Sequence, residues 1–309
     1  MNRLQLDEFE EIFGEKLTKY VEDCINEYTF EYEDFSQSER DELLLIIVKT
    51  LLDPNITKSG EHRRGEWEDG WGENLTDINQ DNKDVESIIP KYFNKYNAIR
   101  WRGKFIKPVG EKFEYHSLRI ILDWLFDKYA RDCDSIYEFG CGPAHHLLRA
   151  RKVNENAKLW GLDWAESSQG IIEKIRHDGI DKNIFGHNFD YFNPELNFKI
   201  DDNSVIFTVA SLEQIGNKWD KFVNYLIDQK PKLCFHVEPI GEMLDENVLV
   251  DYLSIQYFKK RNYLDGFLDG LRKLETEGKV NILDTKRSHI GSLFIEGYSI
   301  VVWKPVSKN

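Results

Sequence analysis

Residues 135–144 of this 309-residue chain combine an acidic residue with two closely spaced glycines in the sequence SIYEFGCGPA. The first five residues are mostly strand formers, and Gly140 and Gly142 allow the backbone to turn tightly and to approach a ligand. Pro143 suits the first position of a helix, where its missing N–H is not needed. The segment therefore predicts a strand that turns directly into a helix, whose free N–H groups are available to a polar ligand.

Acidic residues also follow the later strands that the sequence predicts. Between residues 134 and 239, strand-like runs alternate with helical patterns, which indicates an α/β, doubly wound, mostly parallel sheet flanked by helices. Ligands bind such a sheet beyond the carboxyl ends of its strands, where the strand order reverses. We expect one edge of the sheet to carry the acids that stand at or just past these ends, which are Glu138, Asp163, Asp190, Glu213 and Glu238.

Asp163 lies 21 residues after Gly142, near the spacing at which an acidic residue binds ribose hydroxyls. A carboxylate suits that role because it accepts two hydrogen bonds from a vicinal diol. The alternative is a cap for a helix that begins near Glu166. A dinucleotide-binding oxidoreductase would have a third glycine where this chain has His145, so that class of protein is disfavoured.

The acidic residue two positions before the first glycine of the G-x-G turn resembles the first motif of class I S-adenosylmethionine-dependent methyltransferases. That family usually continues with Thr or Ser and a further Gly, whereas this chain has Pro143 and Ala144. The resemblance covers about residues 134–305. It implies a Rossmann-like, mostly parallel sheet with a C-terminal antiparallel hairpin, which we expect from 283–290 and 296–303.

The same resemblance implies S-adenosyl-L-methionine as the cofactor. Asp190 would meet the adenine amino group, with Phe189 or Trp164 as stacking partner; a plain turn acid is the alternative for Asp190. The residues expected around the cofactor are Glu138, Gly140, Cys141, Gly142, Asp163, Trp164, Phe189 and Asp190.

A hydroxyl acceptor would benefit from a general base, for which the candidates are Glu213, His236, Glu238 and His289. Residues 208–215 resemble the family's fourth motif, where many small-molecule methyltransferases have Leu-Glu-His. Gln214 replaces that histidine, so the role of base does not carry over to it. Strand alternation places His236 and Glu238 on one face, and only Glu238 at the ligand edge. Each histidine has the alternative role of a partly buried, hydrogen-bonded ring.

The formal net charge of −14 opposes broad contact with nucleic acid or an anionic membrane surface. Methyltransferases that act on exocyclic amines of DNA bases share an Asp/Asn-Pro-Pro-aromatic motif at the fourth strand, which this chain lacks. The start of the sequence does not resemble a signal peptide, and no 18-residue apolar run occurs, so we expect a cytoplasmic protein. The four cysteines form no C-x-x-C pair, and neither a metal site nor a disulfide framework is expected.

Residues 1–112 are expected to form an N-terminal helical cap, and residues 113–309 a Rossmann-like domain with an insert at 239–281. The cap should contain a helix from Leu4 to about Tyr28, one after Ser38 and a short one within 84–97. Residues 60–74 hold four glycines, Trp67 and Trp71 among charged residues. We expect a loop there, which either forms a lid or acceptor-site wall or is anchored by its aromatic rings.

The insert carries three tyrosines, at positions 252, 257 and 263, and the basic cluster 259–261. It is a candidate lid over the acceptor, although packing and a helix surface are the alternatives. The combined features predict a methyltransferase that acts on a small polar hydroxylated metabolite such as a sugar, with O-methylation favoured over N-methylation. The alternatives are a protein methyltransferase and a non-catalytic cofactor-binding or scaffold protein, in which the edge acids are structural caps.

Overall fold

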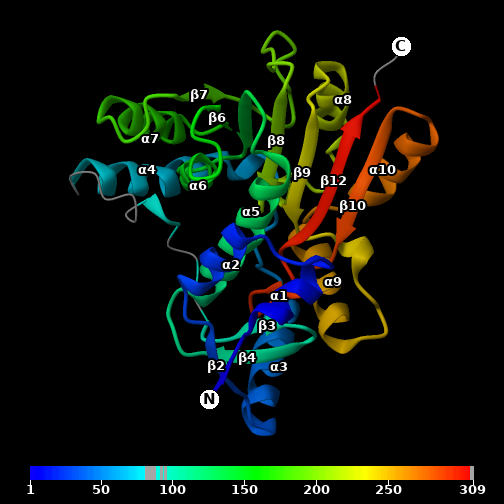
Figure 1. Cartoon of the computed structure of the whole chain (residues 1–309). Helices are drawn as coiled ribbons and strands as arrows, with labels where there is room; N and C mark the ends of the chain where they lie inside the picture. The colour runs from blue at the N-terminus through cyan, green and yellow to red at the C-terminus, as the bar shows by residue number, and fades with distance from the viewer. Residues whose placement is uncertain (81–87, 91–92, 94–95, 307–309) are drawn as a thin grey trace.

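A seven-stranded sheet forms the centre of the computed structural model, which describes residues 1–80, 88–90, 93 and 96–306 (Figure 1). The strand order is β10-β12-β9-β8-β5-β6-β7. Pairing is parallel from β9 to β7 and antiparallel where β12 joins β9 and β10. In chain order the strands are β5 Ser135–Phe139, β6 Lys158–Asp163, β7 Ile184–Asn188, β8 Ser204–Val209, β9 Leu233–Glu238, β10 Val280–Lys286 and β12 Ser299–Pro305.

This order confirms the predicted α/β fold with its C-terminal antiparallel hairpin. The strand order reverses at β5: the chain adds β6 and β7 on one side of it and β8 and β9 on the other. A ligand site is therefore expected beyond the end of β5, where the glycine turn lies. The turn between the hairpin strands is longer than the sequence suggests, because β11 Ile290–Gly291 leaves the hairpin to join a second sheet.

Alternate residues of the central strands pack on opposite faces of the sheet. In β8, Val205, Phe207 and Val209 pack against helices within residues 113–177, whereas Ile206 packs against helices within residues 220–276. Both faces are thus covered, as a parallel sheet requires. The helices that follow residue 112 are α5 Phe113–Tyr129, α6 His145–Arg151, α7 Glu166–His177, α8 Asp220–Gln229, α9 Leu249–Arg261 and α10 Phe267–Thr276.

The N-terminal region is not purely helical. It contributes four strands to a five-stranded sheet of order β1-β2-β4-β3-β11. These strands are β1 Asn2–Arg3, β2 Glu31–Asp34, β3 Ile99–Trp101 and β4 Lys104–Pro108. They have two to five residues each, too few for a clear period-2 pattern, so the sequence did not predict them. The fifth strand, β11, comes from the other end of the chain.

The N-terminal helices also differ from the prediction. The single helix expected from Leu4 to about Tyr28 is two helices, because Gly14 adopts φ 67° and ends the first of them. These helices are α1 Leu6–Phe13 and α2 Lys19–Asn26, followed by α3 Gln37–Leu52. Ser36, not Ser38, caps α3 through a capping box with Glu39. The short helix expected within 84–97 lies largely outside the described residues.

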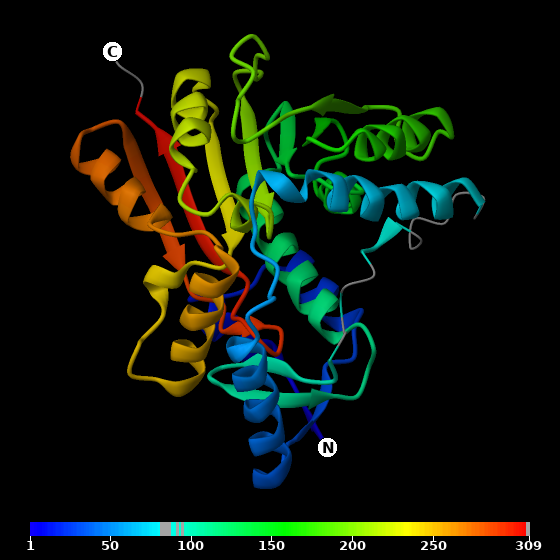
Figure 2. The ribbon, with the colours of Figure 1, turned by 180° about the vertical axis from the view of Figure 1, so that it is seen from behind.

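The expected loop at residues 60–74 is mostly a helix. A short 3₁₀ turn at Glu61–Arg63 leads into α4 Arg64–Gln80, which contains Gly65, Gly70 and Gly72. Glycine in a helix is unfavourable by roughly 0.5–1 kcal/mol relative to alanine, so tertiary contacts must stabilise α4. Figure 2 shows α4 lying along α7, and the Glu68 carboxylate accepts N–H groups from the start of α7 at 2.7 and 2.9 Å.

Candidate functional site

The turn between β5 and α6 requires glycine at two positions. Gly140 and Gly142 have φ of 68° and 50°, in the left-handed region that disfavours other residues. A Cβ on Gly140 would lie 2.4 Å from the Ser211 Cβ, and one on Gly142 would lie 2.8 Å from the Trp71 ring. The segment that follows β8 on one side and helix α4 on the other therefore approach this turn too closely for any side chain.

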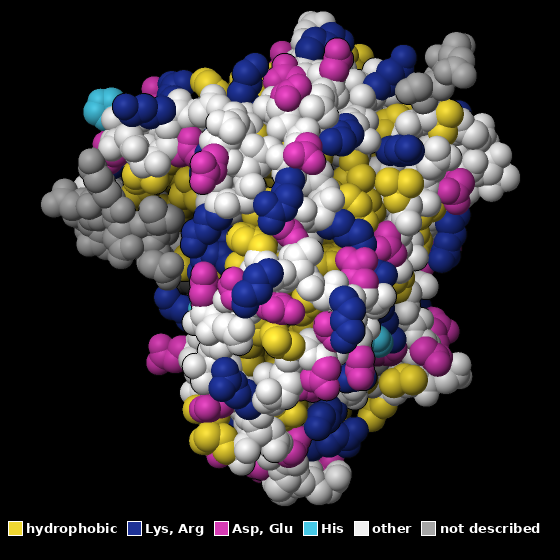
Figure 3. Space-filling model, in the orientation of Figure 1, with side chains coloured by type: hydrophobic (Ala, Val, Ile, Leu, Met, Phe, Trp, Pro, Cys, Tyr) yellow, Lys and Arg dark blue, Asp and Glu magenta, His cyan; other side chains and the backbone are white. Residues whose placement is uncertain are grey.

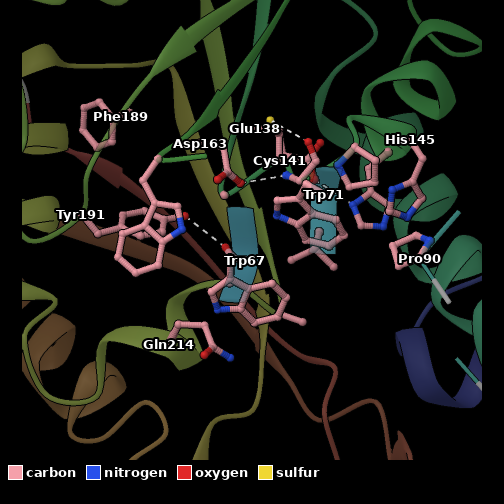
Figure 4. Close-up of a pocket in the computed structure, with 18 of the residues that line it drawn as sticks. Trp67, Trp71, Pro90, Glu138, Cys141, His145, Asp163, Phe189, Tyr191 and Gln214 are labelled. Carbon is pink, nitrogen blue, oxygen red and sulfur yellow. Dashed lines mark hydrogen bonds and ion pairs between the residues drawn. The ribbon is translucent and has the colours of Figure 1, made fainter. Parts of the chain in front are cut away.

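The turn borders a pocket at the carboxyl end of the parallel strands, called the turn pocket here (Figure 4). Trp67 and Trp71 of α4 form one wall, opposite the ends of the strands. Their rings stack with centroids 5.5 Å apart. Of the residues that the sequence assigns to a cofactor, those lining the turn pocket are Glu138, Gly140, Cys141, Gly142, Asp163, Trp164 and Phe189.

Asp163 ties the glycine turn to the start of α7. Its two carboxylate oxygens accept the N–H groups of Gly142 and Ala165, both at 2.9 Å. Burial raises the pKa of Asp163 to about 6. The oxygen that accepts the Ala165 N–H therefore acts as the helix cap that the sequence offers as the alternative role. A carboxylate offers about four acceptor positions, so both oxygens retain capacity toward a ligand diol, and the ribose role stays a prediction.

Several buried polar atoms around the turn pocket have no hydrogen-bond partner among the described residues. Glu138 Oε1 lies 2.7 Å from His146 Nδ1, but Glu138 Oε2, His146 Nε2 and both ring nitrogens of His145 are unpartnered. Burial raises the pKa of Glu138 and lowers that of His145 well below its ordinary value. An unsatisfied buried polar group costs about 1–3 kcal/mol, so such atoms mark places where a polar ligand or ordered water binds.

The end of β7 contributes aromatic rings rather than a carboxylate. Phe189 is buried against Phe139, with ring centroids 4.7 Å apart, and lines the pocket with Tyr191. Asp190 is not among the lining residues; its Oδ1 accepts the N–H of Phe192 at 2.8 Å. Asp190 thus lies in a turn outside the turn pocket, which agrees with the alternative role of a turn acid.

Glu238, a predicted base, is a backbone cap in the structure. It is fully buried, and its oxygens accept the N–H groups of Ser211, Leu212 and Glu213 at 3.1, 3.1 and 3.3 Å. Burial raises its pKa to about 7. Because both oxygens hold the short helix Leu212–Ile215 in place, Glu238 positions that segment and does not line the turn pocket.

Neither of the two candidate histidines lines the turn pocket. His236 is fully buried, with Nδ1 2.9 Å from Thr208 Oγ1, while Nε2 accepts the Trp303 indole N–H at 2.9 Å. Burial lowers its pKa to about 3, so it is a neutral, satisfied core residue. His289 lies between β10 and β11 with 40% of its side chain exposed and does not line the turn pocket. The alternative role of a buried, hydrogen-bonded ring describes His236, and the role of base stays a prediction for both histidines.

Glu213 is the candidate base that faces a second pocket, called the aromatic pocket here. This pocket adjoins the turn pocket, and Trp67, Ala210 and Gln214 line both. Burial, and the nearby Glu238 carboxylate, raise the pKa of Glu213 to about 8. The other polar and aromatic side chains around it include Arg63, Tyr96, Glu114, Tyr257, Arg261, Tyr263, Phe294 and Tyr298.

Gln214 links the segment after β8 to the N-terminal region. Its side-chain nitrogen donates to Glu213 at 2.8 Å, and its oxygen accepts from Ser59 and Arg63, both at 3.0 Å. The position of Gln214 corresponds to the histidine of the resembled motif. In this chain it orients the neighbouring carboxyl group instead of acting as a base.

Other kinds of site are not supported within the part of the chain that the structure describes. There, no cluster of His, Cys, Asp or Glu has the geometry to hold a metal ion, and all four cysteines are free and buried. None of the described helices is both long and apolar enough to cross a membrane. On the face shown in Figure 3, basic and acidic side chains alternate without forming a continuous basic patch.

Comparison with known proteins gives matches among solved structures alone, since no family model and no curated protein sequence matches the chain. Magnesium protoporphyrin IX methyltransferase from Synechocystis PCC 6803, with bound S-adenosylhomocysteine, is 12% identical over 63% of this chain and 86% of its own, with a TM-score of 0.47. Human N-acetylserotonin methyltransferase in complex with S-adenosylmethionine is 11% identical over 78% and 68%, with a TM-score of 0.40.

A third similar structure is an O-methyltransferase from neocarzinostatin biosynthesis in complex with S-adenosylmethionine and 2-hydroxy-5-methyl naphthoic acid. It is 10% identical over 63% of this chain and 58% of its own, with a TM-score of 0.42. The strand order β10-β12-β9-β8-β5-β6-β7 of the chain itself defines its fold.

Proposed function

We propose that this chain is an S-adenosylmethionine-dependent methyltransferase that methylates a hydroxyl group of a small polar molecule. The observation that supports it best is the pair of adjoining pockets at the carboxyl end of the parallel strands. One is built on the glycine turn and holds unpartnered polar atoms; the other contains a buried carboxyl group. Methyl transfer requires two molecules side by side, and adjacent pockets with a shared wall provide that arrangement.

The residues of the turn pocket fit this cofactor. Gly140 and Gly142 leave room for close approach, and Asp163 retains acceptor capacity toward the ribose diol. The unpartnered Glu138 Oε2 suits the ammonium group of the amino-acid end, while Trp164, Phe189 and Tyr191 supply aromatic surface for the adenine. When bound, the cofactor supplies an electrophilic methyl group on a sulfonium.

The aromatic pocket fits the acceptor. Glu213, whose pKa of about 8 lies near physiological pH, would take the proton of the acceptor hydroxyl as the new O–C bond forms. Gln214 and Ser59 fix the orientation of this segment, and Glu238 fixes its backbone. Trp67, which lines both pockets, would separate acceptor from cofactor until the two are aligned.

The acceptor is expected to be a small molecule rather than a nucleic acid. The net charge of −14 repels a polyanion. The aromatic pocket is also lined from several separate elements, among them α4, α9 and residues 292–298, which suits a compact ligand more than an extended chain.

Titration calorimetry with S-adenosylhomocysteine, the product form of the cofactor, tests the proposal. We expect micromolar binding to the intact chain and at least a tenfold loss for Asp163→Ala. Asp190→Ala is the matched control, because this carboxylate lies outside the turn pocket, and should bind as the unmodified chain does. Absence of binding to a folded sample would refute the cofactor assignment. Equal loss in both variants would refute the ribose role of Asp163.

A further inference from the structure

Arg261, the last residue of α9, places a guanidinium group in the aromatic pocket. Its Nε is buried without a hydrogen-bond partner among the described residues, and Tyr263, Tyr257 and Glu213 are the groups that act on the guanidinium electrostatically. The guanidinium lies over the rings of Tyr263 and Tyr257, 5.3 and 6.0 Å from their centroids. These rings hold the group in the pocket and leave its charge unneutralised.

The neighbouring charges do not compensate Arg261. Arg63 is already paired with Glu66 at 2.9 Å and also donates to Gln214. Glu213 is the acid that acts on Arg261 electrostatically, but its burial favours the neutral form at physiological pH. The other acid of the pocket, Glu114, accepts the hydroxyl of Tyr298 at 2.9 Å. Within the described chain, Arg261 is therefore a cation of this pocket that lacks the close carboxylate partner that Arg63 has.

The contrast with the other cations of α9 supports a ligand-binding role for Arg261. Lys259 points outward, with 65% of its side chain exposed, and lies 3.9 Å from Glu246. Lys260 donates to the carbonyl oxygen of Leu51 at 2.6 Å, outside the pocket. Arg261 also has its backbone fixed, since its carbonyl oxygen accepts the N–H of Ser59 at 2.7 Å. A single cation of the cluster thus faces the pocket, and its position is fixed.

Aromatic rings form a continuous wall beside this cation. Tyr257 stacks on Phe294 with centroids 5.1 Å apart, and Tyr96 meets the same phenylalanine edge-on at 5.2 Å. The rings of Tyr263 and Tyr257 meet edge-on, with centroids 6.0 Å apart. Such a wall suits the flat face of a ring, either a sugar or an aromatic system. The pocket therefore offers a surface for a ring, a cation at one point and a carboxyl group at another.

We propose that the methyl acceptor is a hydroxylated ring compound with an anionic group, a carboxylate or a phosphate, that pairs with Arg261 while its hydroxyl faces Glu213. The inference rests on the proposed function and names its acceptor class. A guanidinium binds both anions through paired, charge-assisted hydrogen bonds. In the reaction the acceptor oxygen would form the new O–C bond and give its proton to the ionised form of Glu213, which is present near its pKa of about 8. The C–S bond of the sulfonium would break and leave a neutral thioether.

Binding to the chain saturated with S-adenosylhomocysteine tests the acceptor class, with glucuronate, glucose 1-phosphate and glucose as probes. We expect at least one anionic probe to bind at least tenfold more tightly than glucose, and the tighter of the two distinguishes carboxylate from phosphate. Arg261→Gln should reduce that binding tenfold or more, because a hydrogen bond to a charged group is lost. Lys259→Gln, on the exposed face of the same helix, should leave it unchanged.

The controls separate this inference from the proposed function. Arg261→Gln should bind S-adenosylhomocysteine as the unmodified chain does, which also shows that the variant is folded. If the cofactor product binds but neither anionic probe does, or if glucose binds equally well, the acceptor inference is refuted while the cofactor assignment stands. If the anionic probes bind through Arg261 to a chain that does not bind the cofactor product, the proposed function fails instead.

Discussion

The two pockets differ in how the chain builds them. The turn pocket takes most of its lining from the ends of consecutive parallel strands, within residues 138–146, 163–164, 189–191 and 209–215. The aromatic pocket gathers residues from the N-terminal region, from α9 and from residues 292–298, as far apart in the chain as Thr50 and Tyr298. A site at strand ends follows from topology, whereas a site assembled from distant segments depends on packing.

The pockets also differ in charge. Acidic groups, Glu138 and Asp163, line the turn pocket, which suits a ligand with ammonium and sulfonium groups. The aromatic pocket contains Arg261 together with Arg63, which pairs with Glu66, and the carboxyl groups of Glu114 and Glu213. A pocket with cations and one with acids alone favour two different ligands, each in its own place. This difference predicts that substitutions in one pocket affect one ligand far more than the other.

The largest effect is expected from Glu213→Gln in the aromatic pocket. Removal of a general base lowers the turnover rate by about 10²- to 10⁴-fold, while binding of S-adenosylhomocysteine should not change. In the unmodified chain the rate should rise with pH with a midpoint near 8, where half of Glu213 is deprotonated, and level off at higher pH. Steady-state kinetics across this range provide the check. A variant with the full rate would show that alignment alone drives the transfer.

A substitution in the glycine turn should have the reverse selectivity. Gly142→Ala places a Cβ at φ 50° and within 2.8 Å of Trp71, so we expect at least tenfold weaker cofactor binding and a loss of about 1–2 kcal/mol in unfolding free energy. Gly65→Ala is the matched control, because nothing lies within 4 Å of its added Cβ in α4. That variant should be more stable by about 0.5–1 kcal/mol. Calorimetry and denaturant unfolding measure both effects.

The two tryptophans of α4 differ in which pockets they line. Trp71 lines the turn pocket alone, whereas Trp67 lines both pockets. Trp71→Ala should therefore weaken binding of the cofactor product several-fold, and Trp67→Ala should raise the acceptor KM by more than it weakens cofactor binding. Equal loss of both ligands in both variants would mean that the rings serve only to anchor α4.

The smallest expected effect is a pH-dependent change in stability. Between about pH 4.5 and 8, Glu213 is protonated in the folded chain but ionised in the unfolded chain. The free energy of unfolding therefore falls as the pH rises through this range. Glu238, Tyr263, Gln214 and Arg261 surround this carboxyl group. Between about pH 6 and pH 8, the Tm of the Glu213→Gln variant should therefore fall by a few degrees less than the Tm of the unmodified chain.

The exposed Glu246 provides a control for the stability measurement, since 70% of its side chain is accessible to solvent. Glu246→Gln should show the same pH dependence as the unmodified chain. If Glu213→Gln also shows it, the buried carboxyl at position 213 is already ionised in the folded state, and its use as a base near pH 8 is refuted.

The sequence predicted the core of the fold because its signals are local. Strand-forming runs alternate with helical periodicity from residue 134 onward, and Gly140 and Gly142 stand where a strand meets a helix. The sequence did not predict the short N-terminal strands, and it predicted a loop for α4 because of the glycines in that segment. The contact of Glu68 with α7 stabilises that helix, and no local pattern contains it.

For the site, the sequence by itself determined which residue types stand at the strand ends, and parallel pairing then brings Glu138, Asp163 and Glu213 to one edge. Only the tertiary structure decided what each acid does there. Glu238 became a backbone cap, His236 a satisfied core ring and Glu213 a buried carboxyl with a raised pKa, because burial and hydrogen-bond partners come from residues far away in the chain. The same packing placed Arg261 inside the pocket and Lys259 outside it, although the sequence presents them as one basic cluster.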